Sequence, residues 1–168
     1  MTRELAERLR REHTLRPEEY RRLLEACDEE TFGYLRAAAA ETARARFGNG
    51  IYVRGLVEIG SRCRNDCRYC GIRRSNRRAE RYRLTPETIL DCCRTGYGLG
   101  FRTFVLQGGE DPAWDDGTLT ALVAEIRRRW SDCAITLSLG ERSVASYEAL
   151  FRAGATRYLL RHETADPQ

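Results

Sequence analysis

Residues 103–112 read Thr-Phe-Val-Leu-Gln-Gly-Gly-Glu-Asp-Pro, an apolar run that stops at two glycines and two acids. The apolar part predicts a short buried strand over 103–107, because strand-favouring residues are followed at once by turn residues. A helix is predicted before this strand. Thr85 supplies its N-cap, Pro86 a first-turn proline, and Glu87 an acid near the positive end of the helix dipole.

The same alternation of strand, polar turn and helix extends in both directions from this segment. Strands are predicted at 56–59, 103–107, 134–139 and 157–161, and the helices between them at 85–100, 116–130 and 143–153. Strands that alternate with helices of this length indicate βαβ units and a parallel sheet. Before them, residues 1–46 show helical spacing only, and Phe47-Gly48-Asn49-Gly50 ends it. We therefore expect a helical segment over 1–50 and an α/β domain over 51–168.

All four predicted strands carry their unusual polar residues at their carboxyl ends. The first is followed by three cysteines, the second by Gly-Gly-Glu-Asp, the third by Gly-Glu and the fourth by His-Glu-Thr. This arrangement favours a TIM-type (β/α)8 barrel, in which several strand ends assemble one site. An open doubly wound sheet is less favoured, because no glycine-rich phosphate loop follows the first strand. A whole barrel takes about 250 residues. We therefore expect only its first four βα units, in a truncated chain.

The alternation of side chains along the strands predicts which face of the sheet is polar. In the third strand, Thr136 and Ser138 point away from the apolar set that includes Leu137. In the fourth strand, Arg161 shares a face with Leu159. Helices are expected to cover the apolar set, which leaves Thr136, Ser138 and Arg161 facing the barrel interior. An interior this polar predicts a ligand cavity rather than a filled core.

The composition excludes several classes of protein. All 29 basic residues are arginine, and 25 acidic residues leave a net charge of +4. No apolar run approaches the roughly 20 residues of a membrane-spanning helix, and the N-terminus lacks the apolar core of a secretory signal. We expect a cytoplasmic protein without membrane contact. Six arginines lie between positions 73 and 83, with Tyr82 as the single aromatic residue among them, which favours a solvated or cofactor-side segment over a nucleic-acid surface.

The cysteines indicate a metal centre, because seven in a chain without an export signal do not suggest a disulfide framework. Three follow the spacing C-x3-C-x2-C: Cys63, Cys67 and Cys70. Three thiolates on one loop leave one iron of a 4Fe–4S cluster open for another molecule. A zinc site completed by Cys92, Cys93 or a histidine is the structural alternative, but zinc ligands usually come in pairs and no second pair exists. The other thiols are interpreted as small buried apolar residues: Cys27, Cys92, Cys93 and Cys133.

The cysteine spacing, with Tyr69 before the last cysteine, resembles the signature of the radical S-adenosylmethionine (SAM) superfamily. Within it, the flanking sequence closely resembles the HydE-type maturases of FeFe-hydrogenase, from about Phe47 onward. The similar segments are 53–58, 63–76, 106–112, 136–141 and 157–165. Methylornithine synthases and biotin synthases share the general layout. The Leu-Ser-Leu-Gly-Glu and Leu-Leu-Arg-His-Glu-Thr runs favour the maturase over both.

The resemblance implies roles for individual residues. The implied cluster ligands are Cys63, Cys67 and Cys70, with SAM chelating the fourth iron. The implied SAM contacts are Tyr69 beside the adenine, the backbone of Gly108, Gly109 and Glu110 at the methionine amino group, and Glu163. Glycine is needed there because a side chain would keep the backbone from the ligand. The implied substrate-cavity positions are Thr136 and Arg161.

The resemblance also implies an activity. An electron donor such as a ferredoxin or flavodoxin would reduce the cluster, and SAM would be cleaved to methionine and a 5′-deoxyadenosyl radical. The radical would act on a small-molecule or small iron-complex substrate during assembly of the hydrogenase active-site cluster, alongside other hydrogenase maturases. Methylornithine or biotin synthase chemistry is the alternative within this class. A zinc- or cluster-containing nucleic-acid-binding protein is the alternative outside it.

Overall fold

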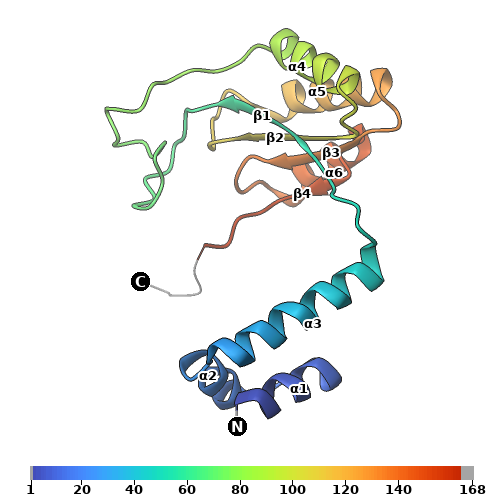
Figure 1. Cartoon of the computed structure of the whole chain (residues 1–168). Coiled ribbons are helices and arrows are strands. Elements are labelled where there is room, and N and C mark those ends of the chain that lie inside the picture. The colour runs from blue at the N-terminus through green and yellow to red at the C-terminus, as the bar shows by residue number, and fades with distance from the viewer. Residues whose placement is uncertain (1, 164–168) are drawn as a thin grey trace. The chain divides into compact units, whose positions relative to one another are not determined.

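The computed structural model describes residues 2–163, and the chain divides into two compact units at Tyr52–Val53. The first unit consists of three helices, α1 (Thr2–Glu12), α2 (Pro17–Glu25) and α3 (Glu29–Phe47) (Figure 1). Leu5, Ala6, Leu15 and Leu23 form its small buried core.

Local signals set where these helices begin. Pro17 occupies the first turn of α2, where a missing N–H costs nothing. Glu19 accepts hydrogen bonds from the Arg16 backbone N–H and the Arg16 guanidinium, each at 3.0 Å, and pairs with Arg8. At the start of α3, the Asp28 carboxylate accepts from the Thr31 N–H at 2.8 Å.

The second unit contains a four-stranded sheet with three helices. Its elements are β1 (Gly55–Gly60), α4 (Pro86–Gly98), β2 (Thr103–Gly108), α5 (Asp116–Arg129), β3 (Ala134–Ser138), α6 (Val144–Ala153) and β4 (Arg157–Tyr158). The strand order is β1-β2-β3-β4, and every pair is parallel (Figure 1). The predicted parallel α/β architecture is confirmed.

The core lies between one face of the sheet and the three helices. Because successive side chains of a strand point to opposite faces, β1, β2 and β3 each contribute every second side chain to this core: Val57, Ile59, Phe104, Leu106, Ile135 and Leu137. The helices contribute the residues that pack against them: Ile89, Cys93, Leu119, Val123, Ile126 and Leu150. The opposite face carries Thr136 and Ser138, as predicted, together with Leu56, which is 55% exposed.

The predicted helix starts are confirmed by their caps. The side chains of Thr85, Asp115 and Ser143 each accept a backbone hydrogen bond three residues ahead, at 3.2, 2.7 and 3.2 Å. At the other end of α6, Gly154 adopts a left-handed conformation with φ of 117°, which residues with a Cβ rarely adopt.

The fourth strand is shorter than predicted. It pairs with β3 only through Arg157 and Tyr158, although Leu159 N–H still donates to the Leu137 carbonyl at 2.8 Å. The reason is that β3 itself ends at Ser138, so nothing on that side remains for residues 160 and 161 to pair with. The prediction that Arg161 lies on the inner face of a strand is therefore wrong. Thr164 of the predicted polar end, and Ala165 of the segment similar to the maturases, lie outside the described residues.

Only two of the four cysteines outside the C-x3-C-x2-C segment are buried, so the prediction of four buried thiols is wrong for the other two. Cys93 and Cys133 are buried, and burial is the main cause that raises the pKa of Cys93 to about 12. Cys92 is exposed and Cys27 is half-buried. Cys92 precedes Cys93 by one position, about 100° around α4, and so turns away from the sheet. In the part of the chain that the structure describes, no helix is long and apolar enough to cross a membrane.

Candidate functional site

The cysteines lie on a long irregular segment between β1 and α4, here called the cysteine loop (residues 61–84). It extends from the carboxyl end of β1, at the left in Figure 1. A loop of this length has many backbone carbonyls that no secondary structure satisfies. The Arg81 guanidinium satisfies four of them, because it donates to the carbonyl oxygens of Ser61, Ile72, Arg73 and Asn76 at 2.5–3.1 Å.

The end of the cysteine loop is tied back to β1. Leu84 N–H donates to the Ile59 carbonyl at 2.9 Å, and Ser61 N–H to the Tyr82 carbonyl at 3.1 Å. Arg83 then reaches Asp111, beyond the end of β2, through two parallel contacts of 2.7 and 2.8 Å. Burial opposes ionisation of Asp111, but the contacts with Arg83 and the Ala113 N–H outweigh it and lower the pKa of Asp111.

The three predicted metal ligands are free thiols on this loop. Cys67 is exposed, while Cys63 and Cys70 are half-buried. Cys70 N–H donates to the Cys67 carbonyl at 3.0 Å, and Asn65 N–H to Cys63 Sγ at 3.4 Å. Within residues 2–163, no three His, Cys, Asp or Glu side chains are grouped closely enough to hold a metal ion. The donor set fits an iron–sulfur cluster, since three uncommitted thiols lie within eight residues, but cluster assembly has to draw them together.

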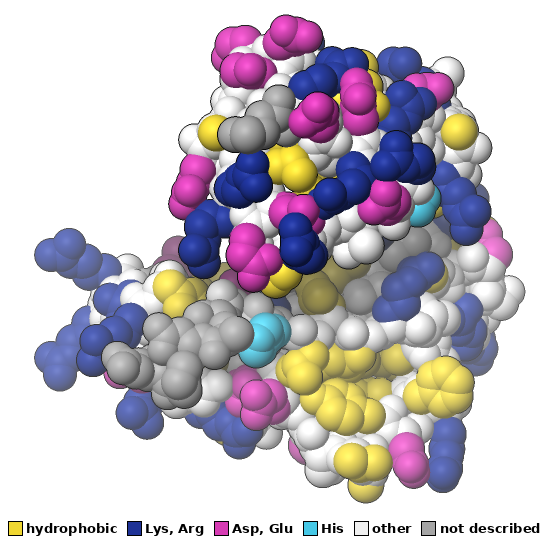
Figure 2. Space-filling view, turned by 90° about the horizontal axis from the view of Figure 1, so that it is seen from below, with side chains coloured by type: hydrophobic (Ala, Val, Ile, Leu, Met, Phe, Trp, Pro, Cys, Tyr) yellow, Lys and Arg dark blue, Asp and Glu magenta, His cyan; other side chains and the backbone are white. Residues whose placement is uncertain are grey.

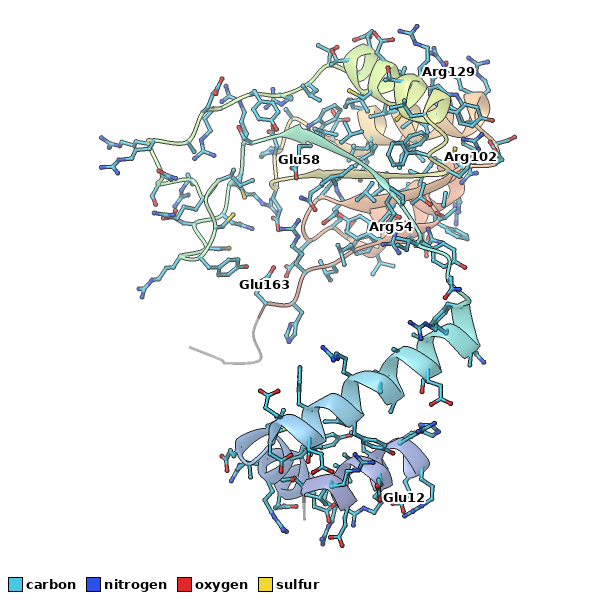
Figure 3. All side chains as sticks on the ribbon, viewed as in Figure 1. Glu12, Arg54, Glu58, Arg102, Arg129 and Glu163 are labelled. Atoms are coloured by element: carbon cyan, nitrogen blue, oxygen red, sulfur yellow. The ribbon has the colours of Figure 1, made fainter. Side chains whose placement is uncertain are left out.

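Two further predicted cofactor residues lie close to these thiols. The pKa of Tyr69 is raised, first by local burial and then by Cys67 and the carboxylate of Glu163. Glu163 lies on the segment after β4, toward the side of the sheet from which the cysteine loop extends (Figure 3). The structure thus brings residues from two distant parts of the chain to one end of the sheet.

The two glycines after β2 lie against the cysteine loop itself. A Cβ on Gly109 would overlap the carbonyl oxygen of Arg62 and the Cβ of Cys63. A Cβ on Gly108 would meet the Gly60 carbonyl oxygen at 3.2 Å, a much milder contact. The expectation that glycine is needed here only for ligand approach is therefore incomplete. Gly109 also lets the cysteine loop pack directly on the end of β2.

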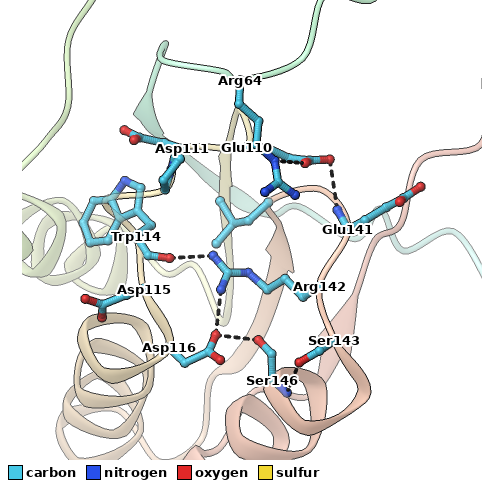
Figure 4. Close-up of a pocket in the computed structure, with 12 residues that line it drawn as sticks. Arg64, Glu110, Asp111, Trp114, Asp115, Asp116, Glu141, Arg142, Ser143 and Ser146 are labelled. Atoms are coloured by element: carbon cyan, nitrogen blue, oxygen red, sulfur yellow. Dashed lines mark hydrogen bonds and ion pairs between the residues drawn. The ribbon is translucent and has the colours of Figure 1, made fainter.

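Glu110 links three segments at this end of the sheet (Figure 4). Its carbonyl accepts from the Arg64 N–H at 2.9 Å, and its Oε2 lies 3.0 Å from Arg64 Nε. Its Oε1 accepts from the Glu141 N–H, beyond the end of β3, at 3.1 Å. Sequence reasoning singled out Glu110 but not Arg64.

A cavity of about 560 Å³ lies beside Glu110, between the amino ends of α5 and α6. Arg142 lines it, donating to the Trp114 carbonyl at 2.6 Å and pairing with Asp116 at 2.7 Å (Figure 4). Ser146 donates to the same carboxylate at 2.6 Å. Sequence reasoning missed this network. The available signal was the acid at the start of a helix, which the helix dipole favours.

The predicted substrate-cavity residues are only partly brought together. Thr136 and Ser138 share one face of β3 and are both buried. The Thr136 hydroxyl has no hydrogen-bond partner among the described residues. Arg161 lies beyond β4 and is exposed.

The fold and the cysteine loop define a class of enzyme. The family model of the radical SAM superfamily matches residues 57–168, so the chain belongs to that superfamily. Enzymes of this superfamily use a 4Fe–4S cluster and SAM.

Particular relatives can then be named. The chain is 44% identical over 129 residues to the [FeFe] hydrogenase maturase subunit HydE of Thermotoga maritima, covering 77% of this chain and 36% of that protein. Its fold resembles crystalline methylornithine synthase (PylB), with a TM-score of 0.86 and 29% identity, covering 96% of this chain and 48% of that one. HydG, another hydrogenase maturase, shares the fold at a TM-score of 0.82 and 24% identity, covering 98% of this chain and 37% of that one. The chain therefore spans less than half the length of these relatives.

Proposed function

We propose that this chain is part of a radical SAM enzyme in which residues 61–84 carry the cluster and the end of β2 carries SAM. The observation that supports this most strongly is the direct packing of Gly109 on the Arg62 carbonyl and the Cβ of Cys63. Because of it, a molecule on the cluster would also touch the Gly-Gly-Glu backbone. Residues 1–50 form the proposed helical segment, and 51–168 the proposed partial barrel.

In the proposed enzyme, Cys63, Cys67 and Cys70 hold the cluster. When bound, a 4Fe–4S cluster supplies the electron that cleaves SAM to methionine and a 5′-deoxyadenosyl radical. The chain's own residues orient the cofactor: the backbone of Gly108, Gly109 and Glu110 receives the methionine amino group. Tyr69 and Glu163 would flank the rest of the molecule. The buried Thr136 hydroxyl, with Ser138 beside it on the same face of β3, would face the substrate.

The proposed substrate is a small molecule or small iron complex used in assembly of the FeFe-hydrogenase active-site cluster. The 44% identity to HydE supports this choice over methylornithine synthase. The structural similarity to PylB keeps methylornithine synthase chemistry, and with it biotin synthase chemistry, as the alternative. Other hydrogenase maturases are the proposed partners, in the cytoplasm.

The proposed electron donor is an acidic protein of the ferredoxin or flavodoxin kind. The cysteine loop that carries the exposed Cys67 also carries three arginines for which the described residues show no ion pair: Arg68, Arg77 and Arg78. Basic side chains crowd the left edge of Figure 2, where the cysteine loop lies. Reduction by such a donor should slow as salt rises, because the attraction is screened over about 10 Å at 0.1 M.

Anaerobic reconstitution tests the proposal. The chain should take up iron and acid-labile sulfide in equal amounts, and the reduced protein should form 5′-deoxyadenosine from SAM. Zinc uptake without sulfide would favour the structural alternative. Tight binding of single-stranded nucleic acid by a cluster-free chain would favour the nucleic-acid alternative.

A further inference from the structure

Glu110 makes side-chain contacts that its proposed backbone role does not require. Its carboxylate is 15% exposed, and both oxygens are engaged. One pairs with Arg64 on the cysteine loop, and the other accepts from the Glu141 N–H after β3. If Glu110 contributed only its backbone to the site, its carboxylate would not need a partner on each oxygen.

Gly140 is shaped to admit this carboxylate. Its φ is 78°, in the left-handed region that favours glycine. A Cβ added there would overlap Cγ and Cδ of Glu110, so any side chain at position 140 would displace Glu110. The Gly140 carbonyl also accepts from the Tyr158 hydroxyl at 2.7 Å, which attaches the same turn to β4.

We infer that Glu110 is a positioning residue, with Arg64 and Gly140 as its partners. Its carboxylate fixes the cysteine loop over the carboxyl ends of β2 and β3, so that a cluster on the loop faces the Gly-Gly-Glu backbone. The inference rests on the proposed function for its effect on SAM. The docking of the loop can be measured in the cluster-free chain.

The strength of this arrangement comes from its charge. A hydrogen bond between a guanidinium and a partly buried carboxylate is stronger than a neutral one, and the Arg64 backbone adds a third contact to the same residue. Loss of the carboxylate should therefore release the loop without unfolding the sheet, whose core lies on the other side of β2.

The first measurement is hydrogen exchange of backbone amides in residues 62–74 of the cluster-free chain. Gly140→Ala and Glu110→Ala should each accelerate this exchange by about tenfold. Two matched exposed residues serve as controls: Arg68→Ala on the same loop and Glu141→Ala, which keeps its N–H. Exchange equal to that of the parent in both Gly140→Ala and Glu110→Ala would overturn the inference.

A double-mutant cycle tests whether Gly140 acts through the space that it leaves for the Glu110 side chain. In the Glu110→Ala background, Gly140→Ala has no side chain to displace, so it should accelerate exchange no further. Additive effects of the two substitutions would show that Gly140 acts through its own backbone strain and not through Glu110.

The second measurement is made on the reconstituted protein. Arg64→Ala and Gly140→Ala should keep the parent's iron content, because all three thiols remain, and should weaken SAM binding by about tenfold. The change that SAM causes in the electron paramagnetic resonance of the reduced cluster should shrink in parallel, and Arg64→Lys should restore part of it. If Arg68→Ala weakened SAM binding as much as Arg64→Ala does, loss of one positive charge would explain the effect, and the positioning role of Glu110 would be overturned. If the parent binds no SAM, the proposed function fails, and hydrogen exchange alone decides the inference.

Discussion

Cys67 is the most exposed of the three loop thiols, and its substitution tests the assignment of the cluster ligands. Cys67→Ser should remove most of the iron and the visible charge-transfer absorption of the reconstituted chain, because a hard oxygen ligand replaces thiolate poorly on iron. Cys92→Ser is the matched control, since Cys92 is also exposed but lies on α4. Iron analysis and absorption spectroscopy measure both. Loss of the cluster in Cys92→Ser, with retention in Cys67→Ser, would reassign the ligands.

Single residues are predictable where their role is local. The spacing of Cys63, Cys67 and Cys70 is enough to predict three thiols on one loop. Arg64 is not predictable, because its partner Glu110 lies 46 positions away. The four carbonyl contacts of Arg81 are not predictable either. Arg81 is one of several arginines in this segment, and nothing in the sequence indicates which of them binds the loop backbone.

At the scale of elements, the contact between the end of β2 and the cysteine loop determines what Gly109 can tolerate. Gly109→Ala should lower iron uptake as well as SAM binding, because its Cβ would push the Arg62 carbonyl and Cys63 away. Gly71→Ala on the same loop is the control, since no atom lies within 4 Å of its added Cβ. Iron analysis and calorimetry with SAM measure the two effects. If Gly109→Ala kept the parent's iron content and weakened only SAM binding, Gly109 would serve only the approach of the ligand and not the packing of the cysteine loop.

The buried carboxylate at the start of α2 predicts a pH dependence for the first unit. Hydrogen bonds from Arg16 and then Arg8 lower the pKa of Glu19 from 4.5 to about 2. A depressed pKa in the folded state means that the stabilisation is complete above pH 4.5 and is lost as pH falls toward 2. Glu19→Gln should lower the unfolding midpoint in urea at about pH 6 and flatten its dependence between about pH 5 and 3. Glu18→Gln, exposed on the same helix, should behave as the parent.

The start of a helix is predictable where a capping residue marks it, whereas the end of a strand is less predictable because it depends on pairing with the neighbouring strand. Thr85 is an N-cap that the sequence predicts, and the structure adds side-chain caps at Asp115 and Ser143. The end of β4 depends on how far β3 continues, and no residue of β4 encodes that. The same reason explains why Thr136 and Ser138 lie on the predicted face while Arg161 lies beyond the strand.

At the scale of the molecule, the parallel sheet follows from the alternation of strands and helices, and the site follows from polar residues at the strand ends. What the pattern does not contain is how the ends are joined. Asp111, Glu110 and Gly109 bind the cysteine loop through three separate contacts, all from the turn after β2. Each contact joins residues that are far apart in the sequence. The sequence therefore predicts that the turn after β2 belongs to the site, but not how this turn binds the cysteine loop.

The sheet of the 168-residue chain predicts how that chain behaves in solution. Within the described residues, β1 from Gly55 to Glu58 and β4 each pair with a strand on one side only, and Leu56 and Leu159 are 55% and 50% exposed. Unpaired parallel edges beside exposed apolar side chains favour association, so the chain should form dimers and larger species at micromolar concentration. Leu56→Lys should reduce this association, because a charge on an edge strand resists pairing. Leu24→Lys, at an 80% exposed position on α2, should not. Light scattering coupled to size exclusion measures the mass directly. A parent chain that stays monomeric would show that the edges of β1 and β4 do not cause association.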